Sequence, residues 1–162
     1  MLETILDELQ LLWPAGDQLV RVAVRLTIAA LLGAIVGFDR ERMGKPAGLR
    51  THMLVALGSA LFVLAPVNQD MPVGDLSRVI QGVAAGIGFL GAGAILKLSD
   101  ERHILGLTTA ASIWMTAAIG ITAGLGQAGL AVLATLVTWV ILAALSAVER
   151  KMGRSAQSAN EP

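Results

Sequence analysis

The sequence contains no cysteine and no tyrosine, and only 15% of its 162 residues are charged. The lack of cysteine excludes disulfides, thiolate metal sites and a cysteine nucleophile. Equal numbers of basic and acidic residues give a net charge of zero, so nucleic acid is not an expected partner. The N-terminus carries Glu3, Asp7 and Glu8 where a secretory signal would carry Lys or Arg, so a cleavable signal peptide is not expected.

Apolar residues take the place of charge and make up 55% of the chain. The surface of a soluble domain of this length needs about 25% charged residues. Several apolar runs approach the roughly 20 residues that cross a bilayer. We therefore predict an all-α integral membrane bundle whose first partner is the lipid bilayer.

The apolar runs predict five transmembrane helices within a domain of residues 17–148. Their expected positions are about 19–38, 51–67, 79–98, 107–125 and 129–148. Residues 1–16 precede this domain and predict a short amphipathic helix on the membrane surface. Residues 149–162 follow it and predict a polar, disordered cytoplasmic tail.

The basic residues of the loops predict the orientation in the membrane. One side holds Arg40, Arg42, Lys45, Arg50, Lys97, Arg102, Arg150, Lys151 and Arg154, and the other holds Arg21, Arg78 and, if it snorkels, Arg25. Because Lys and Arg concentrate in cytoplasmic loops, the N-terminus is expected outside and the C-terminus in the cytoplasm. Arg25 lies roughly 9 Å inside its span, where it either snorkels outward, the favoured interpretation, or faces the protein interior.

Small residues recur at helical spacing within the spans. The candidate packing positions are Gly33, Gly37, Gly82, Gly86, Gly93, Thr108, Ser112, Thr116, Gly120 and Gly124. Small residues allow helices to approach closely in lipid. We expect the third-span glycines and the row from Thr108 to Gly124 to pack against each other or across a homodimer. The alternative is a polar pathway lined by the hydroxyls of that row, as in a transporter.

A charged cluster lies where the first span ends and the second begins. Its members are Asp39, Arg40, Glu41, Arg50, Thr51 and His52. One interpretation is that it anchors two helix ends at the headgroups. Another is that Asp39 and Arg50 form a partly buried ion pair that shapes a site. A third is a magnesium site whose carboxylates come from Asp39, Glu41, Asp100 and Glu101, although five nearby basic residues compete for those carboxylates.

Catalytic patterns are absent from the sequence. No Ser–His–Asp or Ser–Lys constellation stands out, and no nucleotide-binding motif occurs. We therefore predict no enzyme, no catalytic residue and no cofactor, with magnesium as the one ion to consider.

Three ordered motifs resemble those of the MgtC/SapB family. The first is Gly-Phe-Asp-Arg-Glu at residues 37–41, followed by Lys-Pro-Ala-Gly-Leu-Arg-Thr-His at residues 45–52. The second is Gly-Ile-Gly-Phe-Leu-Gly-Ala-Gly at residues 86–93. The third is Gly-Leu-Thr-Thr-Ala-Ala-Ser-Ile-Trp at residues 106–114, with Ala-Ala-Ile-Gly at residues 117–120. The likeness covers residues 20 to 145 of the chain.

The resemblance implies a small bacterial inner-membrane protein with five spans. It implies links to growth in low magnesium, to survival in macrophages and to restraint of the F-type ATP synthase by contact inside the membrane. Longer members carry a soluble C-terminal domain, so this chain resembles a short member. We hypothesise a regulatory protein that acts through helix contacts, as a homodimer and with an ATP synthase subunit as partner. The alternative is a transporter or channel for a cation or small solute.

Overall fold

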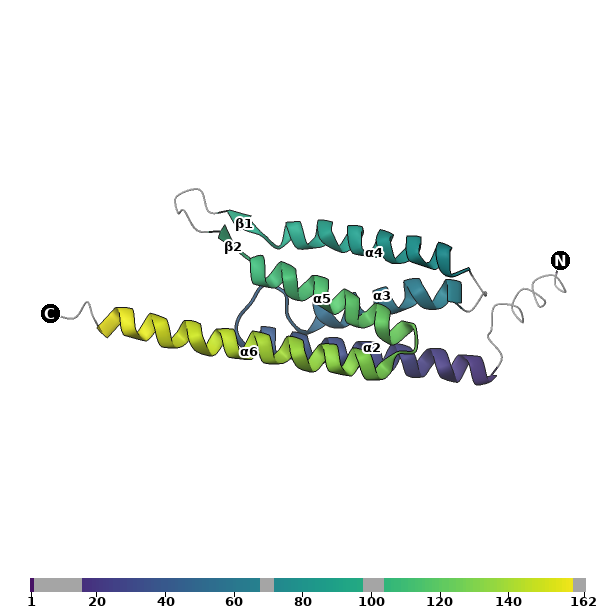
Figure 1. Ribbon diagram of the computed structural model, residues 1–162, viewed down its shortest axis with the longest axis horizontal. Coiled ribbons are helices and arrows are strands. Elements are labelled where there is room, and N and C mark those ends of the chain that lie inside the picture. Colours follow the sequence, from purple (N-terminus) through teal and green to yellow (C-terminus); the bar gives the residue numbers. More distant parts are fainter. Residues whose placement is uncertain (2–15, 68–71, 98–103, 159–162) are drawn as a thin grey trace.

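The computed structural model describes Met1 and residues 16–67, 72–97 and 104–158. The expected amphipathic helix of the N-terminal residues lies outside these ranges. Five helices account for nearly all of the described chain: α2 (Gly16–Arg42), α3 (Leu49–Val67), α4 (Val73–Gly93), α5 (Leu107–Gly124) and α6 (Ala128–Ser158). They run up and down, lengthwise beside one another (Figure 1).

The prediction of an all-α membrane bundle is confirmed. Helices α2, α3, α4 and α5 are long and apolar enough to cross a membrane, and α6 contains a shorter apolar stretch, Ala128–Ala144. The chain is therefore a multi-pass membrane protein. A short antiparallel ladder between β1 (Leu96–Lys97) and β2 (Ile104–Leu105) links α4 to α5. The end of the bundle that carries this ladder is called the hairpin end below.

The observed helix α4 lies earlier in the sequence than the expected span at residues 79–98. It begins at Val73 because the Pro72 carbonyl accepts hydrogen bonds from the Asp75 and Leu76 N–H groups, at 2.9 and 3.1 Å. Proline suits a helix start because its missing N–H would have no partner there. The helix ends at Gly93, since the chain then enters the β1–β2 ladder.

Helix α6 continues to Ser158, so the segment expected to be disordered from residue 149 is helical over its described part. Once a helix exists, each further residue adds one hydrogen bond without a new nucleation cost. Residues 149–158, the described part of this segment, contain no proline, which would interrupt a helix. Polarity alone was therefore a poor indicator of where the helix ends.

Helix α5 occupies the centre of the bundle and contacts α2, α3, α4 and α6. Helix α4 lies along one edge, against α5 and α3 (Figure 1). Alanine dominates the buried core, at Ala29, Ala56, Ala60, Ala123 and Ala131. Lipid tails are as apolar as these side chains, so close packing rather than removal from water holds such helices together.

Helix α3 is held between α2 and α5 by glycines on both neighbours. A Cβ at Gly33 would lie 2.6 Å from the His52 carbonyl oxygen, and a Cβ at Gly124 would lie 2.7 Å from the Ala60 carbonyl oxygen. A Cβ at Gly120 would overlap the backbone of Ala56. The small-residue row of α5 thus packs against α3. The expected pairing of this row with the third-span glycines is not observed.

Arg25 faces the protein, in contrast to the favoured snorkelling interpretation. Its Nη1 donates a hydrogen bond of 3.1 Å to the carbonyl oxygen of Gly124, at the C-terminus of α5. Its guanidinium also lies against Gly126, whose φ of 82° places the chain in the left-handed turn between α5 and α6. A cation is stabilised there by the unpaired carbonyls and the dipole of the helix end.

Candidate functional site

Four polar side chains meet between α2, α3 and α5 at the hairpin end. Arg40 comes from α2, His52 from α3, and Thr109 and Ser112 from α5. All four are buried; His52 is fully buried and Arg40 is 2% exposed. These four residues are called the polar cluster below.

The sequence makes room for this cluster through glycine. A Cβ at Gly37 would lie 2.8 Å from the Leu49 Cα atom and 3.0 Å from the His52 Cβ atom. Only a residue without a side chain lets α2 approach α3 so closely. The tight turn between the two helices contains Gly44, which has a φ of 65°. As a result, Arg40 near the end of α2 lies close to His52 near the start of α3.

His52 connects α3 to α5 through both ring nitrogens. Nδ1 lies 2.9 Å from the Gly48 carbonyl oxygen, and Nε2 lies 3.2 Å from Ser112 Oγ. A carbonyl oxygen can only accept, so Nδ1 carries a hydrogen. Ser112 Oγ also lies 2.8 Å from the Thr109 carbonyl oxygen, and its single hydrogen can serve either that oxygen or Nε2. The ring is thus held at both ends.

Arg40 connects α2 to the same part of α5. Its Nη2 donates a hydrogen bond of 3.3 Å to Thr109 Oγ1. About two turns further along α5, Thr116 Oγ1 donates to the Ser112 carbonyl oxygen at 2.8 Å. A buried charge in a membrane bundle is costly unless polar groups contact it, and the Thr109 hydroxyl provides such a contact for the guanidinium.

The polar cluster is suited to fixing three helices in register. The pair of Ser112 and His52 lies at hydrogen-bonding distance, but the group that orients His52 is a backbone carbonyl rather than a carboxylate. Ser112 is also buried. A nucleophile needs both an oriented base and access to substrate. The arrangement therefore favours structure over nucleophilic chemistry.

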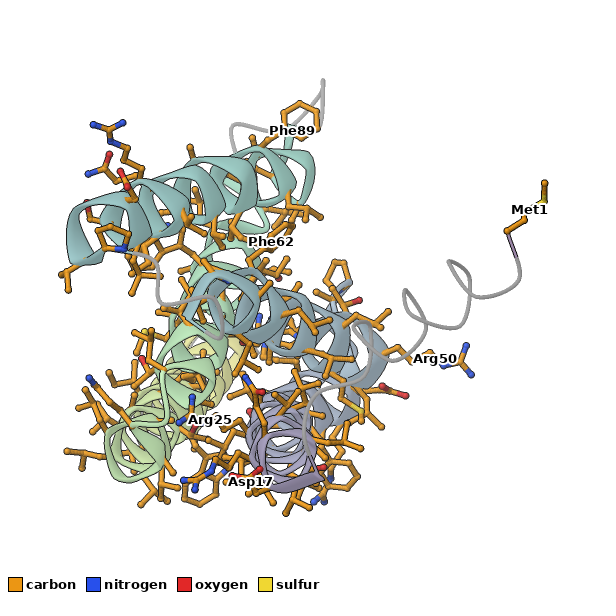
Figure 2. All side chains as sticks on the ribbon, turned by 90° about the vertical axis from the view of Figure 1, so that its right-hand side faces the viewer. Met1, Asp17, Arg25, Arg50, Phe62 and Phe89 are labelled. Carbon is orange, nitrogen blue, oxygen red and sulfur yellow. The ribbon has the colours of Figure 1, made fainter. Side chains whose placement is uncertain are left out.

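The predicted ion pair between Asp39 and Arg50 is not formed. In the described part of the chain, salt bridges join Arg21 to Asp17 and Arg78 to Asp75. Arg50 is exposed and points away from the bundle (Figure 2). Helix α2 and helix α3 are joined instead through the buried neighbours of this pair, Arg40 and His52.

The other predicted members of the charged cluster have separate positions. Glu41 Oε2 accepts a hydrogen bond of 2.7 Å from the Leu49 N–H, so this carboxylate caps the start of α3. Asp39 is half-buried, and its Oδ2 atom has no hydrogen-bond partner among the described residues. Thr51 is half-buried on α3. Within the described residues, Asp39 and Glu41 belong to no group of three side chains that could hold a metal ion, and Asp100 and Glu101 lie outside the described residues.

The candidate packing positions divide into two groups. Gly33, Gly37, Gly120 and Gly124 touch the backbone of α3 or of the turn before it, and Ser112 and Thr116 are buried beside them. Gly82, Gly86 and Gly93 on α4 face open space, since a Cβ there would meet nothing within 4 Å among the described residues. Thr108 is exposed. Close approach of two helices therefore explains the small residues on α2 and α5, but it does not explain the glycines on α4.

Sequence reasoning missed Thr109 and the capping role of Arg25. Thr109 precedes Ser112 by three residues, so both lie on one face of α5 and the helical period could have revealed it. A comparable signal marks Arg40, which follows Ala29, Gly33 and Val36 on the buried face of α2. The partner of Arg25 is 99 residues away, and no local pattern indicates it.

Comparison with known proteins shows similarity over the part of the chain that contains the polar cluster. The MgtC family profile matches residues 26–151. Protein SrpB of Synechococcus elongatus is 45% identical over 148 residues, which cover 85% of this chain and 81% of SrpB. No solved structure matches the chain significantly.

Two further relatives are longer than this chain. YhiD of Escherichia coli K12, whose name proposes magnesium transport, is 44% identical over 74% of this chain and 58% of its own length. Protein MgtC of Salmonella typhimurium is 41% identical over 70% of this chain and 48% of its own length. The chain thus spans about half the length of these two relatives, and most of SrpB.

Proposed function

Because the chain belongs to the MgtC family, we propose that it is an inner-membrane regulatory protein that acts through helix contacts with another membrane protein. The process that it serves is adaptation to low magnesium. The partner that the family resemblance suggests is a membrane subunit of the F-type ATP synthase. The hairpin end faces the cytoplasm in this proposal.

The observation that carries the proposal is the uncovered outer face of α4. Ala85, Gly88, Phe89 and Ala92 are exposed there, and Phe89 is 84% exposed. A Cβ at Gly88 would meet nothing within 4 Å among the described residues. A face of small residues beside one large aromatic suits a second helix, which can approach the backbone and pack against the ring. Figure 2 shows Phe89 projecting from α4 away from the other helices.

The polar cluster supports regulation over cation transport. It is the main group of buried polar side chains at the hairpin end, and it contains the guanidinium of Arg40. A fixed positive charge repels a cation at close range. The Ser112 hydroxyl lies 2.8 Å from the Thr109 carbonyl oxygen and 3.2 Å from His52 Nε2, and the Thr109 hydroxyl accepts from Arg40, so neither needs an ion as a partner.

Affinity capture from native membranes tests the proposal. A Gly88→Leu variant should retain less ATP synthase subunit than the wild type, because the larger side chain holds a partner helix away from α4. Gly129→Leu is the matched control, since Gly129 also faces open space but lies in the first turn of α6. Equal retention by the wild type and both variants would contradict the contact face. Magnesium flux through the purified protein in proteoliposomes would favour the transporter instead.

A further inference from the structure

An apolar groove of about 730 Å³ runs between α3 and α4. Leu54, Gly58 and Phe62 line it from α3, and Val79, Val83 and Ile87 line it from α4. Phe62 lies between the two helices in Figure 2. The groove is not enclosed, and nearly all of its lining is apolar.

Helix α4 stands too far from α3 for the groove to be a closed helix contact. Gly82 and Gly86 line the groove, yet a Cβ at either would meet nothing within 4 Å among the described residues. Glycines at a tight helix crossing, such as Gly120, contact the backbone of the neighbouring helix. The space beside Gly82 and Gly86 is therefore wide enough for an additional chain of atoms.

A basic residue, Arg50, also stands at the hairpin end of the groove, with its side chain extending outward from the helices. Arg50 and Thr51 line it there, one turn or less from the start of α3. Arg50 is exposed and forms no salt bridge with a described carboxylate. The N-terminal dipole of α3 adds to this positive potential. The groove thus combines an apolar floor with a cationic entrance.

The length of the groove matches one leaflet of a bilayer. From Arg50 to Phe62, α3 rises about 18 Å at 1.5 Å per residue. Half of the hydrocarbon core measures about 15 Å. A molecule whose charged group lies at Arg50 would therefore extend its apolar part to the middle of the membrane.

We infer that this groove binds one anionic phospholipid, with its phosphate at Arg50 and an acyl chain between α3 and α4. Basic pockets between transmembrane helices are suited to anionic headgroups, and here the apolar floor continues directly from the cation. A second copy of the chain fits less well, because symmetric contact at this groove would bring two Arg50 side chains and two helix N-termini together. The deeper hydroxyl of Ser59 can turn to a carbonyl of its own helix, so it requires no polar ligand.

Native mass spectrometry of the full chain in mild detergent tests this site. Phosphatidylglycerol should be retained in preference to phosphatidylcholine, and Arg50→Gln should lower its retention about fivefold. Arg42→Gln is the matched control, because Arg42 is exposed at the same end but stacks 5.6 Å from the Phe38 ring on α2, outside the groove. Inorganic phosphate should not displace the lipid, since it cannot fill the apolar floor.

A groove-filling variant tests the acyl-chain half of the site. Gly82→Phe should reduce phosphatidylglycerol binding while Arg50 remains, and Gly129→Phe should not. Equal binding of the two lipids, or equal loss in Arg50→Gln and Arg42→Gln, would overturn the assignment. A Gly82→Phe chain that changes from dimer to monomer with unchanged lipid binding would also overturn it, in favour of a second copy. If Gly82→Phe does not fold, the phosphatidylglycerol retention of Arg50→Gln still tests the lipid site, because this substitution leaves the groove intact.

Discussion

Arg40 and His52 lie inside a membrane bundle because each has hydrogen-bond partners there. Lipid offers no donors or acceptors, so a polar group that leaves water must be satisfied by another part of the chain. His52 meets Gly48 and Ser112, and Arg40 meets Thr109. These contacts join helices that apolar packing alone would leave free to slide, so the polar cluster sets their register.

Two serines allow the contribution of this cluster to be measured. Ser112 and Ser59 are both 3% exposed, but only Ser112 has a hydrogen bond to another helix among the described residues. We expect Ser112→Ala to lower the free energy of unfolding by about 1 kcal/mol, because His52 Nε2 loses its partner. Ser59→Ala should leave stability unchanged or slightly higher.

Thermal unfolding of both variants in the same detergent provides the comparison. The expected order of Tm is Ser59→Ala at or above the wild type and Ser112→Ala below it. Equal Tm values for the two variants would show that the hydrogen bond to His52 does not stabilise the bundle.

The charged cluster shows how far residue-level prediction reaches. The sequence located the correct segment, since Arg40 and His52 were both among its candidates. One of the three interpretations paired Asp39 with Arg50, because opposite charge was the available criterion. Adjacent residues on a helix differ in direction by about 100°. The buried positions therefore follow from the small-residue face of α2, which includes Arg40, rather than from charge.

At the scale of helices, the position of α3 depends on what its neighbours lack. Gly33 of α2 and Gly120 of α5 lie against its backbone from two sides. We expect Gly120→Ala to lower the free energy of unfolding by roughly 1–3 kcal/mol, because the added Cβ overlaps the backbone of Ala56. Gly82→Ala should cause no loss, since the space beside it is open and Ala favours helix.

Denaturation in mixed micelles, followed by circular dichroism, measures this difference between the two glycine substitutions. The same substitution in two helices controls for the intrinsic helix preference of alanine. A Gly120→Ala variant as stable as Gly82→Ala would mean that α5 can move away from α3 at no cost.

Helix existence was predictable from apolar runs, whereas several helix boundaries were not. The expected bounds of α5, residues 107–125, differ from the observed Leu107–Gly124 by one residue. Pro72 sets the start of α4, and the polar end of α6 continues as helix to Ser158. Hydropathy indicates which part of a helix is surrounded by lipid. It does not indicate where the helix ends, because backbone hydrogen bonds can continue the helix into a polar segment.

At the scale of the whole molecule, sequence could not choose the neighbours of each helix. The row from Ser112 to Gly124 suits any close partner, and both α3 and α4 offer small residues. The structure places α3 there and leaves α4 in contact through Gly91, whose added Cβ would lie 3.5 Å from the Ala110 Cβ atom. Partner choice depends on the packing of all five helices together, which no single segment encodes.

The distribution of charge over the whole molecule predicts how it lies in the membrane. Arg42, Lys45 and Arg50 are exposed at the hairpin end. At the opposite end, Arg21 and Arg78 each lie beside an acidic residue, at 3.9 and 4.0 Å. Because exposed basic residues are retained on the cytoplasmic side, the hairpin end should face the cytoplasm.

The absence of cysteine makes this orientation directly measurable, since any introduced thiol is unique. Pro46→Cys places one in the turn between α2 and α3, and Gln127→Cys places one between α5 and α6; both positions are exposed. A membrane-impermeant maleimide should label Gln127→Cys on intact spheroplasts and Pro46→Cys only after lysis. The reverse order would invert the molecule and place Arg50, with its groove, in the outer leaflet.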